Sequence, residues 1–240
     1  MFARWARWCV AIQVSEISGI AFLVGLASLS VGSSMSAQQT ERRVVVLPPV
    51  AHESLGELTD AFHHRRSVRA FAPHALTLRQ VAHLMWASQG TTHADGLRTA
   101  PSAGALYPLE IYLVVGSVEG LAPGIYRYRS VSHDLVFHQT GDRRARVAAA
   151  ALNQGWMAAA AATVVIAAEF ERTTRKYEER GLRYVHIEVG HAGQNLALTA
   201  AALGLGTVFV GAFDDARVHG VLELPAAHRP LGLMPVGRPQ

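Results

Sequence analysis

Cysteine and lysine are nearly absent from this chain of 240 residues, which contains one of each, Cys9 and Lys176, beside 21 arginines. A single cysteine excludes an internal disulfide, a CxxC redox pair and a cysteine-based zinc site. The sequence also lacks a basic stretch interleaved with aromatic residues, so its net charge of +4 does not by itself indicate nucleic-acid binding. With 50% hydrophobic and 17% charged residues, the composition predicts a globular protein of one domain, with or without a tail.

Residues 1–40 differ in character from the rest of the chain. Two arginines precede residues 17–31, an uncharged run of apolar or small residues, and a short stretch of small residues follows. The run falls short of the roughly 20 residues needed to span a bilayer. The segment therefore reads as an export signal or a membrane-proximal segment, with the protein exported or membrane-associated. The alternative is a mis-assigned start, with translation from Met35 giving a cytoplasmic chain.

The remainder, residues 44–240, is expected to form one α+β domain. Two capping boxes, Ser54 to Glu57 and Thr77 to Gln80, mark helix starts. Helices are predicted over residues 54–62, 77–90, 142–154, 184–203 and 214–222. Strands are predicted over residues 44–50, 109–115, 125–129, 135–139, 163–168, 207–210 and 231–236. Hairpin strands mixed with long helices, without regular βαβ alternation, favour the α+β class.

Two motifs resemble known binding motifs, a dinucleotide-binding turn and a metal site, but the order of elements or the spacing around each one disfavours that function. Gly204 and Gly206 suggest a dinucleotide-binding turn, but that turn follows a strand and opens a helix, whereas here a helix precedes it. A helix C-cap with a tight turn is the better interpretation. His186, Glu188 and His191 suggest metal ligands, but a histidine spacing of five places the two rings on different helix faces. We expect an ordinary helix there and no metal site.

Two further segments could contact a ligand that has a phosphate group and a flat ring. Residues 65–69, Arg-Arg-Ser-Val-Arg, gather three guanidiniums and a hydroxyl, which suits a phosphate because arginine binds phosphate oxygens two at a time. Alone, such a cluster is more often a solvated loop. Residues 101–108, Pro-Ser-Ala-Gly-Ala-Leu-Tyr-Pro, are small and apolar between prolines, so backbone can approach a flat ligand closely.

The order of these segments resembles the FMN-dependent nitroreductase superfamily, and most closely the SagB-type dehydrogenases, the flavin oxidases of thiazole and oxazole peptide synthesis. The resemblance covers nearly everything from residue 47 to residue 239. The motifs that carry it are residues 65–71, 84–90, 98–110, 123–128, 176–181, 188–196, 210–215 and 235–238. It implies a nitroreductase-like sandwich, a mostly antiparallel sheet flanked by helices, and a homodimer with FMN bound between the subunits.

The resemblance also implies the site residues. The phosphate and the N1–O2 edge of FMN would be held by Arg65, Arg66, Ser67 and Arg69, with Arg238 completing the phosphate site. Pro101, Ser102, Ala103 and Gly104 would lie along the isoalloxazine ring. Gly211 and Ala212 would offer backbone N–H groups near flavin N5 and O4. A phosphate dianion needs several donors, and a reduced flavin favours positive charge near N1.

Lys176 and Tyr177 match the pair proposed as the acid/base dyad of azoline oxidases. Independently, a single lysine among 21 arginines is expected where arginine cannot serve, because lysine can lose its proton and arginine cannot. The implied reaction is hydride transfer at flavin N5 during azoline-to-azole oxidation. The alternatives are an NAD(P)H-dependent nitro or quinone reductase and a flavin-free basic protein that binds anions or nucleic acid.

Overall fold

The computed structural model describes residues 44–49 and 58–240. Residues 1–40, with the expected signal-like segment, and the expected capping box at Ser54 lie outside the described residues. None of the described helices combines the length and apolarity needed to cross a bilayer.

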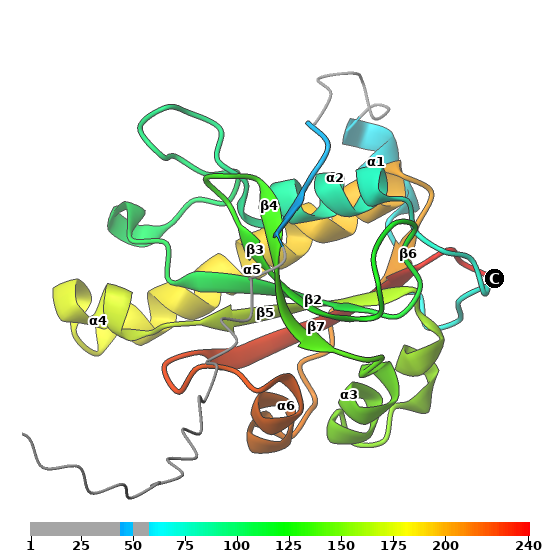
Figure 1. The fold of residues 1–240 in the computed structure, drawn as a ribbon. Helices are drawn as coiled ribbons and strands as arrows, with labels where there is room; N and C mark the ends of the chain where they lie inside the picture. Colours follow the sequence, from blue (N-terminus) through cyan, green and yellow to red (C-terminus); the bar gives the residue numbers. More distant parts are fainter. Residues whose placement is uncertain (1–43, 50–57) are drawn as a thin grey trace, which may run out of the picture. The chain divides into compact units, whose positions relative to one another are not determined.

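A seven-stranded sheet forms the centre of the domain, with the strand order β1-β4-β3-β2-β5-β7-β6 (Figure 1). All pairings between these strands are antiparallel. The strands are β1 (Val44–Val46), β2 (Leu109–Val115), β3 (Gly124–Arg129), β4 (Asp134–Thr140), β5 (Ala162–Ala168), β6 (Gly206–Thr207) and β7 (Arg229–Gly237). The predicted α+β class and the mostly antiparallel sheet are confirmed.

Helices cover both faces of the sheet, with α2 and α5 on one face and α3 and α6 on the other (Figure 1). The helices are α1 (Leu58–His64), α2 (Leu78–Gln89), α3 (Arg144–Ala150), α4 (Glu171–Tyr177), α5 (Arg180–Ala202) and α6 (Asp215–Leu222), with 3-10 turns η1 (Ala103–Ala105) and η2 (Gly155–Ala159). On β2, Ile111 and Leu113 join the core beneath α2 and α5, whereas Tyr112 and Val114 join the opposite core. Every residue of β2 and β5 is therefore buried.

Local signals located several element ends correctly. Thr77 caps α2 with the full reciprocal capping box, and the Asp214 side chain accepts from the backbone N–H of Arg217 at the start of α6. Gly204 has a φ of +67° directly after α5, as a C-terminal cap requires. The glycine-rich segment is thus a helix end and a turn into β6.

Other boundaries differ from the predicted ones. Residues 171–177, which lie outside the predicted helices, form the helix α4, and α5 begins at Arg180, before the predicted residue 184. These helices pack closely, because a Cβ at Gly181 would lie 2.9 Å from Thr174 Cα. α3 ends at Ala150, short of the predicted residue 154, and β6 contains only Gly206 and Thr207. Tertiary packing overrides weak local preference at these positions.

Candidate functional site

The basic turn, residues 65–69, is held between β6 and the tail that follows β7. The Val68 N–H donates to the Thr207 carbonyl oxygen at 3.0 Å, and the Ala72 N–H donates to the carbonyl oxygen of Arg238 at 2.8 Å. A Cβ at Gly206 would lie 2.6 Å from Val68 Cγ1, so this close approach requires glycine. The structure therefore brings the backbone of Arg238 to the segment that follows the basic turn.

The guanidiniums of this region are free to bind an anion. Within residues 58–240, no carboxylate lies within ion-pair distance of Arg65, Arg66, Arg69 or Arg238. Arg65 and Ser67 line a cleft of about 290 Å³ against α5. Arg65 alone of the four arginines lines this cleft, and Arg65 and Arg66 line a second hollow of about 190 Å³. Unpaired guanidiniums at these hollows fit a phosphate group, which needs several charged donors.

The small-residue loop, residues 101–104, is fixed by its own hydrogen bonds. The Ser102 Oγ accepts from the backbone N–H of Tyr107 at 2.9 Å. Gly104 has a φ of +63°, a left-handed conformation that favours glycine. A Cβ at this position would lie 2.8 Å from Tyr177 Oη and 3.0 Å from Lys176 Nζ. The structure thus brings the loop and the Lys176–Tyr177 pair together, although 72 residues separate Gly104 from Lys176.

Lys176 and Tyr177 end helix α4 and lie beside each other. Lys176 Nζ is 5.3 Å from the centroid of the Tyr177 ring. That ring packs edge-to-face on Tyr184 of α5, with centroids 5.0 Å apart. Lys176 is exposed and Tyr177 half-buried in the single chain. The tyrosine is therefore positioned by packing, and the ammonium is accessible.

Gly211 and Ala212 follow the point where Val210 bridges β7 at Leu233. The Ala212 carbonyl oxygen accepts a hydrogen bond from Gln154 Nε2 at 3.0 Å. Gly211 and Ala212 are both exposed. No hydrogen bond or ion pair of the described residues joins them to the basic turn or to the loop. Their N–H groups lie at the surface.

The basic turn and the small-residue loop contact different faces of α5. Asn195 Nδ2 donates to the Thr99 carbonyl oxygen at 3.3 Å, on the side of the loop, whereas Ala197 lines the cleft with Arg65. His191, whose Nδ1 lies 3.3 Å from the Pro101 carbonyl oxygen, and Gln194 of the cleft are three residues apart, or about 60° around the helix. The two halves of the expected flavin site therefore contact different but adjoining faces of α5 within one chain.

Glu188 is a buried acid that the sequence reading treated as an ordinary helix position. It is 2% exposed and accepts hydrogen bonds from Gln89 Nε2 at 3.1 Å and from Ser102. Burial raises the pKa of Glu188 to about 7. One feature of the sequence could have indicated that Glu188 is buried. It lies three residues after Val185 and four before Ala192, so all three share one face of α5, and Val185 and Ala192 are buried.

Glu188→Gln should remove one pH-dependent component of stability. Because the folded-state pKa is raised from 4.5 to about 7, the stabilisation is fully present below pH 4.5 and is lost as the pH rises through 7. The loss amounts to roughly 3 kcal/mol at about 1.36 kcal/mol per unit of pKa. Urea unfolding of both proteins from pH 4.5 to pH 8 tests this; parallel curves would contradict it.

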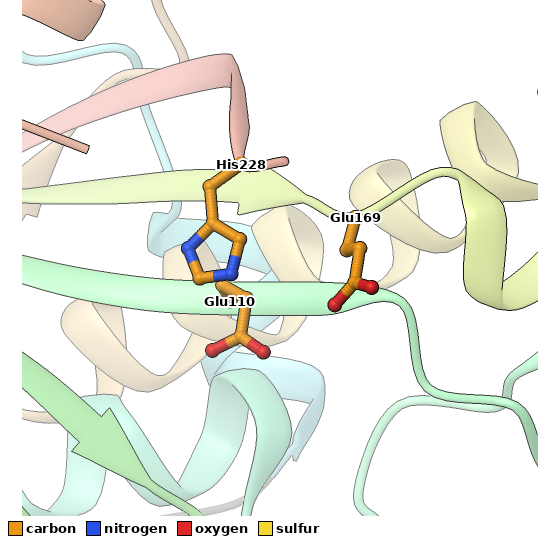
Figure 2. Close-up of side chains that lie close together, drawn as sticks. All are labelled: Glu110, Glu169 and His228. Carbon is orange, nitrogen blue, oxygen red and sulfur yellow. The ribbon is translucent and has the colours of Figure 1, made fainter. Parts of the chain in front are cut away.

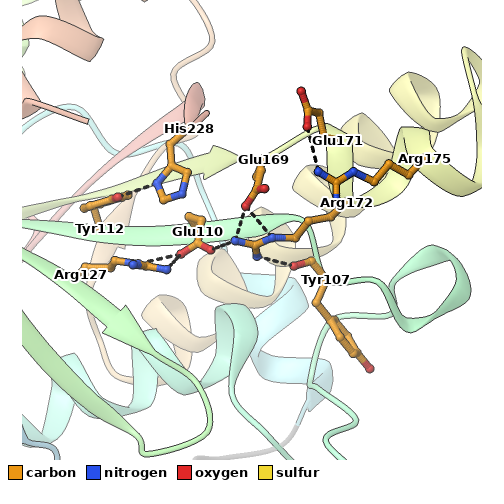
Figure 3. A network of polar contacts seen from close by, with 9 residues as sticks. All are labelled: Tyr107, Glu110, Tyr112, Arg127, Glu169, Glu171, Arg172, Arg175 and His228. Carbon is orange, nitrogen blue, oxygen red and sulfur yellow. Dashed lines mark hydrogen bonds and ion pairs between the residues drawn. The ribbon is translucent and has the colours of Figure 1, made fainter. Parts of the chain in front are cut away.

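A second polar network lies at one end of the central strands β2, β5 and β7 (Figures 2 and 3). Glu110, Glu169 and His228 lie close enough together to bind a metal ion. Glu110, however, accepts from Arg127 Nε at 2.8 Å and from an Arg172 nitrogen at 2.5 Å, and Arg172 also binds Glu169. Two guanidiniums beside the carboxylates repel a cation. The arrangement is therefore that of an ion-pair network.

A model of the nitroreductase family matches residues 63–238. The chain belongs to the nitroreductase family. It is 47% identical over 182 residues to a protein of Methanocaldococcus jannaschii named "Putative nitroreductase MJ1384", covering 76% of this chain and 91% of that protein. Two Rhizobium leguminosarum proteins, TfxC and TfxB of the trifolitoxin system, are 25% and 29% identical over 69% and 75% of this chain. The chain spans about half (51%) of each of these two.

Solved structures agree with this family. A Ralstonia eutropha structure named as a "putative nitroreductase" has a TM-score of 0.72 at 25% identity and covers 84% of this chain and 91% of that one. The fold also matches the Escherichia coli microcin synthetase McbBCD complex, with a TM-score of 0.63, 21% identity and coverage of 91% and 85%. The NADPH:FMN oxidoreductase of Vibrio harveyi has a TM-score of 0.56, 21% identity and coverage of 76% and 69%. The nitroreductase fold and an oxidoreductase activity follow for this chain.

Proposed function

We propose that this nitroreductase-family protein is an FMN-dependent dehydrogenase of the SagB type that oxidises an azoline or a similar small heterocycle. The observation that carries the proposal is the contact of Lys176 and Tyr177 with Gly104. The contact supports the proposal because an amine and a phenol, both able to transfer a proton, lie beside the loop that would lie along the flavin ring.

Relatives support this reading. Two of them belong to the trifolitoxin system, and TfxB is named as a trifolitoxin-processing protein. The microcin synthetase complex was solved with truncated pro-MccB17 bound. A peptide-borne azoline is accordingly the substrate class we propose.

Each group of residues has a separate role in this proposal. Members of the family typically bind FMN, which when bound supplies hydride transfer at N5. Arg65, Arg66, Ser67, Arg69 and Arg238 would bind its phosphate and the N1–O2 edge. Residues 101–104 would support the ring, with the backbone of Gly211 and Ala212 facing its N5 and O4 edge. Lys176 or Tyr177 would take the proton that leaves the substrate carbon as hydride departs.

We further propose that two chains complete each site. Within one chain the basic turn and the loop contact different faces of α5, and no hydrogen bond or ion pair of the described residues joins them. Leu58 and Phe62 of α1 and Ile187 of α5 are 64%, 55% and 48% exposed. Such apolar exposure on packed neighbouring helices suits a subunit interface.

A second function is favoured by other relatives. The name of the archaeal protein and the Vibrio harveyi oxidoreductase suggest an NAD(P)H-dependent reductase of nitro compounds or quinones. The two functions share the FMN site and differ in the hydride donor. An NADPH-dependent reduction of FMN as fast as turnover would favour the reductase.

Purified protein should be yellow, release about one FMN per chain on denaturation, and behave as a dimer in light scattering. A colourless protein that cannot be reconstituted with FMN would favour the flavin-free, anion-binding alternative. A monomer that still holds flavin would remove the two-chain site while leaving the cofactor assignment intact.

A further inference from the structure

Beside the small-residue loop lies a cavity of about 450 Å³ that no part of the proposed flavin site uses. This volume is in the range of small-molecule sites. Four arginines line it: Arg98, Arg127, Arg129 and Arg172. Glu110 is the one carboxylate of the lining. The cavity is therefore strongly basic at its surface.

Three of the four arginines are already neutralised. Arg127 and Arg172 share Glu110, with nitrogen–oxygen distances of 2.7 and 2.5 Å (Figure 3). Arg129 forms a bidentate ion pair with Asp134, with nitrogen–oxygen distances of 2.5 and 2.7 Å. These ion pairs fix the walls of the cavity and leave little charge for a ligand.

Arg98 is the exception. Within the described ranges, no carboxylate lies within ion-pair distance of it. Its partners are neutral: one guanidinium nitrogen donates to Gln89 Oε1 at 3.0 Å, and the guanidinium carbon lies 4.4 Å from the centroid of the Tyr107 ring. Arg98 is half-buried, and burial lowers its pKa. Glu110 and Glu188 act on Arg98 only through space, so an anion in direct contact would offset more of the cost of partly desolvating this cation.

A second hollow of about 610 Å³ adjoins the cavity, since Ser130 and Val131 line both. Trp86 also lines this hollow, and Val131 is 83% exposed. Together they offer an aromatic and an aliphatic surface next to the basic cavity. A single unpaired guanidinium suits a monoanion better than a phosphate dianion.

We propose that the Arg98 cavity binds the carboxylate of a ligand whose adjoining apolar group lies against Trp86 and Val131. The cavity is tied to the loop through Tyr107. The backbone N–H of Arg98 donates to Tyr107 Oη at 3.3 Å, which leaves its guanidinium out of this bond. A guanidinium nitrogen of Arg172 donates to the Tyr107 carbonyl oxygen at 3.1 Å. That this carboxylate belongs to the enzyme's substrate rests on the proposed function; the binding site itself does not.

The test is calorimetric titration of the FMN-reconstituted full-length protein with 3-phenylpropionate and with its amide, 3-phenylpropanamide. A blocked dipeptide with a free C-terminal carboxylate, and its amide, distinguish a peptide end from a free acid. We expect the acid of at least one pair to bind about tenfold or more tightly than its amide. Equal binding of acid and amide in both pairs, or no binding, overturns the proposal.

Variants locate the site. Arg98→Gln should weaken acid binding about tenfold or more, and Arg98→Lys, which keeps the charge, should weaken it less. Arg79→Gln is the matched control: Arg79 is exposed on α2 and outside the cavity lining, so binding should change less than about twofold. Equal losses in the glutamine variants overturn the proposal. FMN content is measured in each sample, so a protein that binds the acid but retains no flavin refutes the proposed function alone.

Discussion

Lys176→Arg should slow azoline oxidation about 10²–10⁴-fold while FMN remains bound, as expected for loss of a general base. The substitution keeps the positive charge beside Gly104 but removes a group that can lose its proton. Oxidation of an azoline requires one ring carbon to give up a proton as hydride leaves the neighbouring ring carbon, so that a double bond forms between them. Single-turnover measurement of flavin reduction by the azoline substrate isolates this step from reoxidation.

Tyr177→Phe and the quinone reaction provide the controls for Lys176→Arg. Reduction of a quinone by prereduced enzyme needs no protein base, so both variants should keep it largely intact. Tyr177→Phe retains the ring that packs on Tyr184 and removes only the hydroxyl. Full azoline activity in Lys176→Arg would make Lys176 an electrostatic or structural residue and end its assignment as a proton carrier.

Arg66→Ala and Arg238→Ala should each weaken FMN binding about 10- to 150-fold, because a charge-assisted hydrogen bond contributes about 1.5–3 kcal/mol. Both residues are exposed and lack carboxylate partners among the described residues, so their removal disturbs no ion pair. One guanidinium nitrogen of Arg66 donates to the carbonyl oxygen of Arg65 at 2.8 Å, which leaves its other nitrogens for a phosphate.

Riboflavin separates the phosphate contribution from the rest of the site, since it carries the same ring without a phosphate. The two variants should bind riboflavin as wild type does. Arg146→Ala, an exposed arginine on α3, serves as the matched charge control and should leave FMN binding unchanged. If the arginine variants lose riboflavin and FMN equally, or lose neither, the phosphate lies elsewhere.

Elements defined by local patterns were predictable from the sequence. The strands predicted over residues 109–115 and 163–168 are confirmed as β2 and β5, and the Thr77 capping box predicted the start of α2. The sequence analysis did not predict α4, because its residues are largely polar and show no apolar periodicity. On its surface Arg175 and Glu171 form an ion pair at 3.2 Å. Its helical state depends on packing against α5, which no local signal reports.

The sequence by itself determined the family, the order of the strands along the chain and the chemical types in the two flavin-site segments. The family follows from the resemblance of its ordered motifs, and the rest from residue types and short-range spacing. Only the tertiary structure decided that Lys176 reaches Gly104, that Glu188 is buried beside Gln89, 99 positions away, and that no carboxylate of the described residues lies within ion-pair distance of Arg98. The free energy of a charge or a hydrogen bond depends on the groups around it. Contacts between segments distant in sequence create that environment only when the chain folds.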